Sequence, residues 1–230
     1  MNTAQHIIGG GDLIMADKKV LLFGGTGRTG LEITHLLQAH DDHVIVVARD
    51  DSNTVDVEAA GATIVRGDVF DPEALTAAAT SAPCDLAICT IGNRPGADRK
   101  VDFDGVRNVV DSCVAAGITR FVLITSIGCG NSRSALSEQT LKFLGPMCER
   151  KTQGEDYLCA TDLNWTIIRP GGLSSDPPSG NAILSEDPLT SGEVNRSDVA
   201  RFTIECLDNP ESAGKIYSAV DPNIRVPGQP

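Results

Sequence analysis

Three evenly spaced glycines follow an apolar run near the start of the 230-residue chain, in LLFGGTGRTGLEI at residues 21–33. The run favours a strand, and the residues after it favour a helix over about 28–40. Between the two, Gly24 would allow a tight turn, Gly27 would let a pyrophosphate approach the backbone, and Gly30 would let the helix pack closely. The N–H groups that open such a helix bind phosphate oxygens, aided by the helix dipole. The stretch therefore predicts a nucleotide site formed by Gly24, Thr26, Gly27, Arg28, Thr29 and Gly30.

The other apolar runs are short, and longer helical stretches separate them. They are nearly continuous instead of alternating, which is typical of strands buried on both faces in a parallel sheet. The alternation of strands and helices predicts an α/β fold with a doubly wound parallel sheet, the Rossmann fold that binds NAD(P). Helices are expected over about 28–40, 100–117 and 197–208, and from near Pro146, as the first helical position, to about Ala160.

The length suits a single domain with a sizeable core. We expect this domain at residues 17–222, including a C-terminal segment that covers the substrate, followed by a tail at 223–230. Residues 1–16 are expected to be a flexible extension, because the sequence MADKKVLLFGG resembles a natural start of its own. The Pro-, Ser- and Gly-rich stretch at 174–181 is predicted to be a mobile loop, and residues 174–190 a cover beside the site.

The chain is acidic, with a formal net charge of −12 and a pI of about 4.6. An acidic surface repels nucleic-acid phosphates, so nucleic acid is excluded as the main partner, whereas a small anionic ligand is compatible. No window reaches the roughly 18 apolar residues that a membrane helix requires, and no signal peptide is recognisable. A small-molecule substrate is therefore the expected partner, and the chain is expected to be a monomer or a small homo-oligomer.

The seven cysteines are scattered and form no CxxC pair. Several lie in apolar runs, so we expect free and mostly buried thiols, which imply a reducing compartment and a cytoplasmic location. The four histidines show no metal-ligand spacing, so no metal site is predicted.

The second strand indicates which nucleotide is bound. Enzymes that use NAD place an acidic residue near the end of this strand, where it holds the ribose 2′-hydroxyl. Here the strand HVIVVARD ends in Arg49, and Arg28 stands in the glycine turn, so two guanidinium groups would converge on a 2′-phosphate. Asp50 could instead be the NAD-type acid, and Arg49 a surface residue at the strand end. The pattern predicts NADP in preference to NAD.

Six motifs occur along the chain in the order GGTGRTG, VVARD, VRGDV, CTIG, ITSIG and IIRPGGL. As a set they resemble the atypical short-chain dehydrogenase/reductases, in particular the NmrA-like and the flavin reductase/biliverdin IXβ reductase-like NAD(P)-binding proteins. The resemblance covers about residues 18–220. Its motifs are specific for the cofactor site and unspecific for the substrate.

The resemblance implies roles for individual residues. Ser126, at the end of the fifth strand, would be the catalytic or substrate-contacting serine. Asp68 could instead cap a loop, and Gly92 could be a plain turn glycine. The residues implied to contact the cofactor are Asp68 and Val69 at the adenine, Thr90, Ile91 and Gly92 at the adenosine ribose and phosphates, and Pro170, Gly171 and Gly172 at the nicotinamide amide.

The sequence departs from the family at the expected proton donor. Most short-chain dehydrogenases carry Tyr-x-x-x-Lys, in which the lysine holds the nicotinamide ribose and the tyrosine exchanges the proton. The matching residues here are MCERK, from Met147 to Lys151, so the lysine is present and the tyrosine is absent. Tyr157 lies too far along the helix to replace it, and Tyr217 lies in the last predicted strand.

This departure leaves several interpretations open. Lys151 could hold the ribose, and be catalytic in that sense, while solvent or Ser126 assists the proton step for acceptors such as flavins or bilins. Alternatively, Lys151 is a surface residue that pairs with Glu155, and Cys129 is either a substrate contact or a small packed thiol. The leading hypothesis is an NADPH-dependent reductase of a small conjugated or carbonyl acceptor (flavin, bilin, quinone or ketone). The alternative is a non-catalytic NADP(H) sensor or assembly factor that acts through protein contacts.

Overall fold

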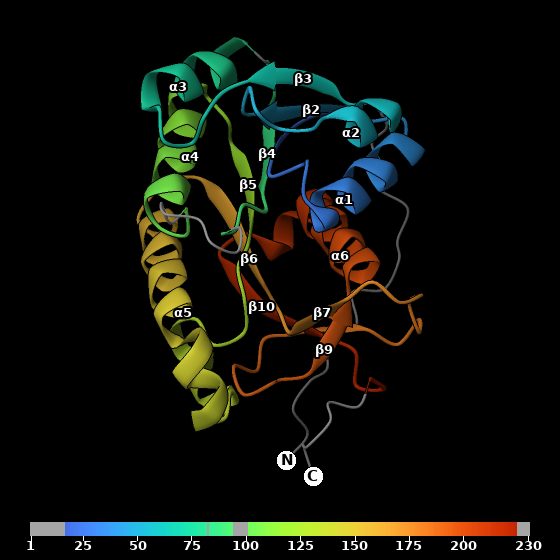
Figure 1. Cartoon of the computed structure of the whole chain (residues 1–230), viewed down its shortest axis with the longest axis vertical. Helices are drawn as coiled ribbons and strands as arrows, with labels where there is room; N and C mark the ends of the chain where they lie inside the picture. The colour runs from blue at the N-terminus through green and yellow to red at the C-terminus, as the bar shows by residue number, and fades with distance from the viewer. Residues whose placement is uncertain (1–16, 82, 94–100, 225–230) are drawn as a thin grey trace.

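The computed structural model describes residues 17–81, 83–93 and 101–224. Within them, the central sheet contains β1 (Lys19–Phe23), β2 (His43–Ala48), β3 (Thr63–Arg66), β4 (Leu86–Cys89), β5 (Arg120–Ile124), β6 (Asn164–Pro170), β8 (Ile183–Ser185) and β10 (Lys215–Val220). The strand order is β3-β2-β1-β4-β5-β6-β10-β8, and all neighbours are parallel except β8 and β10. This single-domain Rossmann sheet confirms the predicted fold (Figure 1).

Helices cover both faces of the sheet (Figure 1). One layer contains α1 (Arg28–Ala39), α2 (Val55–Ala59) and α6 (Arg196–Asp208), and the other contains α3 (Pro72–Ser81), α4 (Asp104–Ala115) and α5 (Glu138–Cys159). In β1, Val20 and Leu22 belong to the core below the first layer, whereas Leu21 and Phe23 belong to the core below the second. Burial on both faces explains why the strand sequences are nearly continuously apolar.

The strand order reverses at β1, because the chain adds β2 and β3 on one side of it and β4, β5 and β6 on the other. At such a switch point the connections leave the carboxyl ends of neighbouring strands in opposite directions, which opens a crevice where ligands bind. The predicted glycine turn leaves β1 at this crevice.

The helix expected to begin near Pro146 begins earlier, so that prediction was wrong. Helix α5 starts at Glu138, and Ser137 caps it by accepting a hydrogen bond from the Thr140 N–H at 3.2 Å. Pro146 lies inside the helix. A proline is a strong signal for a first helical position, but the Ser137 cap supplies a competing start about two turns upstream.

Part of the segment predicted as a loop over 174–190 is regular structure. Residues 183–185 form β8 and pair with β10, while β7 (Gly172–Ser174) and β9 (Glu193–Asn195) form a separate two-stranded parallel sheet. Residues 175–182 form an exposed or half-buried loop between β7 and β8, and hydrogen bonds hold this loop against the rest of the domain. Ser175 accepts a hydrogen bond from Arg196 at 2.7 Å, and Ser179 donates one to the buried Asp221 carboxylate.

The remaining elements agree with the predicted positions where the structure describes them. Helices α1 and α6 lie within about two residues of their predicted bounds. Helix α4 begins at Asp104, and the start expected near residue 100 falls outside the described residues, as do the extension at 1–16 and most of the tail. The cysteines are free, and all but Cys159 are buried. Within the described ranges, no helix is long and apolar enough to cross a membrane.

Candidate cofactor and active site

The glycine turn after β1 is shaped by close backbone contacts. Gly24 has a φ of +86°, in the left-handed region that favours glycine, and a Cβ there would lie 2.9 Å from the carbonyl carbon of Thr90. A Cβ on Gly30 would lie 2.3 Å from the Gly24 oxygen, so the start of α1 is pressed directly against the turn. A Cβ on Gly27 would have one neighbour, at 3.3 Å, so this position is the open side of the turn.

The start of α1 offers its backbone N–H groups to a ligand. Gly27 is the N-cap residue, no side chain accepts a hydrogen bond there, and the first turn carries no acidic residue. The first N–H groups of a helix have no partner within the helix. Together with the helix dipole, this makes the glycine turn a site for an anionic group.

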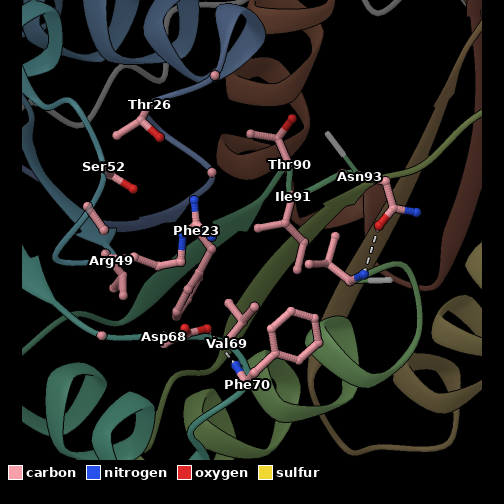
Figure 2. Close-up of a pocket in the computed structure, with 17 residues that line it drawn as sticks. Phe23, Thr26, Arg49, Ser52, Asp68, Val69, Phe70, Thr90, Ile91 and Asn93 are labelled. Atoms are coloured by element: carbon pink, nitrogen blue, oxygen red, sulfur yellow. Dashed lines mark hydrogen bonds between the residues drawn. The ribbon is translucent and has the colours of Figure 1, made fainter. Parts of the chain in front are cut away.

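A cavity of about 470 Å³ lies at the carboxyl ends of β1, β2, β3 and β4, beside this turn. Figure 2 shows Arg49 and Ser52 on the β2 side of the cavity and Thr90 and Asn93 on the β4 side. Residues that sequence analysis did not single out complete the lining, including Phe23, Ser52, Phe70 and Asn93. The predicted cofactor residues that line the cavity are Gly24, Thr26, Gly27, Arg49, Asp68, Val69, Thr90, Ile91 and Gly92.

At the Asp68 end of the cavity the loop-cap interpretation is confirmed, and the adenine contact stays a prediction. The Asp68 Oδ1 accepts a hydrogen bond from the Phe70 N–H at 2.9 Å, so Asp68 caps its loop while it also lines the cavity. The Val69 carbonyl accepts a hydrogen bond from Asn108 on α4 at 2.8 Å, which fixes the loop against that helix. A Cβ on Gly92 would meet nothing within 4 Å, so no steric contact requires glycine at that position.

Arg49 lies at the rim of the cavity, and a second arginine, Arg66, lies on the neighbouring strand. Arg49 and Arg66 together line a second cavity of about 340 Å³, and Arg66 donates a hydrogen bond to the Arg49 carbonyl at 2.8 Å. Arg28 lines neither cavity. The pKa of Arg196 is lowered by burial and, secondarily, by the charge of Arg28, which places Arg28 on the α6 side of the turn. The convergence of Arg28 and Arg49 on a 2′-phosphate stays a prediction; the structure shows Arg66 beside Arg49, because β2 and β3 are neighbours in the sheet.

The rim also carries acidic groups. Four aspartates line the second cavity: Asp50, Asp51, Asp68 and Asp71. Asp51 pairs with the Arg49 Nε at 3.3 Å. The Arg49 side chain is 37% exposed, so this ion pair contributes little to stability and leaves Arg49 able to change partner.

The predicted catalytic residues lie outside the cavity lining. Ser126 follows β5, is half-buried, and donates a hydrogen bond to the Ile127 carbonyl at 3.0 Å. Lys151 on α5 is 9% exposed, and its Nζ lies 3.1 Å from the Asp102 carboxylate. Glu155 pairs instead with the buried Arg169, at 2.7 Å, so the interpretation of Lys151 as a surface partner of Glu155 is wrong.

The turn from Pro170 to Gly172 is fixed within the protein. The Gly171 N–H donates to Ala219 and the Gly172 N–H donates to Gly192. A Cβ on Gly171 would lie 2.1 Å from the Gly192 oxygen, which explains the glycine. Because both N–H groups are used, a ligand at this turn would meet carbonyl groups.

Cys129 fits the packed-thiol interpretation. It is fully buried and hydrogen-bonds with the Cys148 thiol, which raises the pKa of Cys129 and lowers the pKa of Cys148. Met147, at the position of the family's tyrosine, is half-buried and carries no group that could exchange a proton.

Comparison with known proteins places these features in a family. Residues 24–210 match the model of a family described as NAD(P)H-binding. The chain belongs to this NAD(P)H-binding family. The match begins directly after β1 and includes the glycine turn and the other three strands around the cavity, β2, β3 and β4. It confirms the resemblance to atypical short-chain dehydrogenase/reductases.

Relatives span most of the chain. An uncharacterized chloroplastic protein of Arabidopsis thaliana is 35% identical over 88% of this chain and 76% of its own length. The uncharacterized sugar epimerase YhfK of Bacillus subtilis is 32% identical over 88% of this chain and 94% of its own length. The structure of ChuY, an anaerobillin reductase of Escherichia coli O157:H7, matches with a TM-score of 0.82 and 31% identity, over 91% of this chain and 100% of that one.

Proposed function

We propose that this protein is an NADPH-dependent reductase that transfers hydride to a small conjugated acceptor. The observation that carries the proposal is the cavity at the strand-order switch, which predicted cofactor residues line in a chain of the NAD(P)H-binding family. The likeness to ChuY supports a bilin as the first acceptor class to test, ahead of flavins, quinones and simple carbonyl compounds.

The residues at the crevice fit a dinucleotide. The uncapped start of α1 and the open side of the turn at Gly27 suit a pyrophosphate. The cavity beside them, with Asp68 and Val69 at one end, suits the adenosine. When bound, NADPH would supply the hydride.

The preference for NADPH over NADH rests on Arg49 and Arg66. Both line the second cavity next to the proposed adenosine site, and guanidinium groups bind phosphate oxygens in a bidentate manner. The four carboxylates that line the same cavity oppose the preference, because they would repel a 2′-phosphate. We infer that Arg49 exchanges its exposed pair with Asp51 for the phosphate.

In this proposal the chain orients the acceptor and the cofactor and supplies no dedicated acid. Ser126 would turn its hydroxyl from the Ile127 carbonyl to the acceptor, and Lys151 would hold the nicotinamide ribose. Because Met147 replaces the tyrosine, the proton would come from solvent. A conjugated acceptor suits such a site, since charge that develops on hydride addition spreads over its π system.

The test is NADPH oxidation by the purified protein with a panel of bilins, flavins, quinones and carbonyl compounds. We expect turnover with at least one conjugated acceptor, a slower rate with NADH, and little activity with simple ketones. Omission of the acceptor is the control for oxidase activity. Tight NADPH binding without turnover of any acceptor would contradict the reductase proposal.

The methionine at position 147 supports one alternative function. A chain that binds NADP(H) but lacks the family's proton donor could act as a non-catalytic sensor or assembly factor. In that case NADPH and NADP⁺ should differ in how they change binding to a protein partner. The same acceptor panel separates the two functions.

We further propose that the protein works in a reducing compartment as a monomer or small homo-oligomer. The buried free thiols support the first point. Cytoplasm is the proposed location, and the chloroplastic relative makes a plastid the alternative to test by imaging of a tagged chain.

A further inference from the structure

A buried carboxylate connects Lys151 to the wall of the cofactor cavity. The Asp102 side chain is fully buried, and its Oδ1 lies 3.1 Å from the Lys151 Nζ. Its Oδ2 accepts a hydrogen bond from the Asn93 side-chain amide and lies 3.9 Å from the Arg150 Nε. Asp102 is therefore the point at which α5 and the segment after β4 meet.

Asn93 carries this connection to the cavity. Its Oδ1 accepts a hydrogen bond from the Val101 N–H at 2.9 Å, and both Asn93 and Val101 line the cavity (Figure 2). With its oxygen and its nitrogen both engaged, the Asn93 amide has one orientation. The Asp102 carboxylate is thus fixed relative to the cavity wall.

The backbone brings α5 close enough for this contact. A Cβ on Gly154 would lie 3.0 Å from the Asp102 carbonyl oxygen and 3.2 Å from the Val106 side chain. Glycine at position 154 thus lets the helix approach the Asp102 backbone, and Lys151 lies one turn before it on the same side.

Lys151 is held in a way that leaves part of its ammonium free. The side chain is 10% exposed, so it does not extend into solvent, and its charge is paired with the buried Asp102 carboxylate. This contact is an ion pair in which the Asp102 Oδ1 accepts no hydrogen bond from the described residues. The N–H donors of the ammonium therefore remain for the two hydroxyls of a ribose.

We propose that Asp102 is a positioning residue: its carboxylate fixes the Lys151 ammonium at the Asn93 edge of the cavity, where Lys151 binds the nicotinamide ribose. The inference rests on the proposed binding of NADPH. It adds that Asp102 affects the cofactor only through Lys151.

The test is a double-mutant cycle with Asp102→Asn, Lys151→Met and the double variant, with NADPH affinity measured by fluorescence titration. Each single variant should weaken NADPH roughly ten-fold, and the double variant should bind within about two-fold of Lys151→Met, because contacting residues are not additive. In steady state, Asp102→Asn should raise the KM for NADPH and change kcat less. If Asp102 were merely structural, its substitution would lower the fraction of folded protein without raising the KM for NADPH more than it changes kcat.

Asp104→Asn is the matched control. Asp104 lies two residues further on, is exposed, and pairs with Arg107 at 3.7 Å, so its loss should not change NADPH affinity. If Asp102→Asn does not fold, the NADPH affinities of Lys151→Met and of the double variant are compared instead. Both proteins lack the lysine charge, so a further loss of affinity in the double variant would show an effect of Asp102 that does not act through Lys151.

The inference is overturned if Asp102→Asn binds NADPH like the wild type, or if the losses in the cycle add. It is also overturned if Lys151→Met binds normally, because Asp102 would then have nothing to position. These results leave the proposed function intact as long as the wild type binds and oxidises NADPH. Failure of the wild type to bind NADPH would instead overturn both.

Discussion

The two ends of the crevice are built differently. At the end beside the glycine turn, the walls are turns that follow β1, β2, β3 and β4, and the cavity is open between them. At the other end, Ser126, Lys151 and the turn at 170–172 lie outside the cavity lining, and their polar groups already bond within the protein. The first end is open to a ligand, whereas under the proposed function the second end would exchange internal bonds for contacts with cofactor and acceptor. Binding and turnover should therefore respond to different substitutions.

The largest effect is expected from Gly30→Ala. Its new Cβ would overlap the Gly24 oxygen, 2.3 Å away, and the turn would have to shift. We expect loss of measurable NADPH binding and destabilisation of about 1–3 kcal/mol, the usual range for overpacking. Isothermal titration and thermal unfolding measure the two. Gly145→Ala in α5 is the control for stability, since its Cβ would come no closer than 3.6 Å to Arg133. Normal NADPH binding by Gly30→Ala would contradict the account of the turn.

The next effect is on cofactor choice. Arg49→Ala should weaken NADPH by roughly 1.5–3 kcal/mol, the scale of a hydrogen bond to a charged group, and leave NADH almost unchanged. Arg66→Ala should weaken NADPH binding by a smaller amount. Arg28→Ala should weaken it least, because Arg28 lines neither cavity. Dissociation constants for both cofactors give the answer. Equal affinities of the wild type for NADPH and NADH would refute the preference.

At the other end of the crevice, Ser126→Ala should lower kcat roughly ten-fold and leave the NADPH KM nearly unchanged, because orientation counts most in the transition state. Lys151→Ala should chiefly raise the NADPH KM. Tyr157→Phe should have little effect, since the Tyr157 hydroxyl bonds to Asp111 on α4. Abolition of turnover by Tyr157→Phe or Tyr217→Phe, in a protein that folds and binds NADPH, would show that a phenol is the missing acid.

The smallest effect of NADPH binding is expected in residues 174–190, the segment predicted to cover the site. Loop 175–182 is already tied by its bonds to Arg196 and Asp221, so NADPH should increase its hydrogen-exchange protection only modestly. Ser179→Ala should enlarge that increase by loosening the free state. No change in protection at saturating NADPH, in either protein, would remove the cover from the account.

The difference between the two ends of the crevice also determines how much could be predicted from the sequence. The glycine turn is local: its spacing, its strand and its helix are adjacent in the chain, so the fold and most of the cavity wall were predictable. Arg66 and Asp102 act through partners that are distant in sequence. Nothing in VDFDG distinguishes the buried Asp102 from the exposed Asp104, because only the packing of α5 makes the difference. Likewise, β8 is too short to recognise without its neighbour β10.

Hydride transfer itself is the central claim, and isotope transfer tests it most directly. The protein would be incubated with NADPH deuterated at the transferable position of the nicotinamide, together with the best acceptor of the panel that receives hydride on carbon, such as a bilin, and the product analysed by mass spectrometry. The account predicts a reduced acceptor that carries the deuterium, and far less of it from deuterated NADH. A reduced acceptor without deuterium at a non-exchangeable carbon, or no reduced acceptor in spite of bound NADPH, would contradict it.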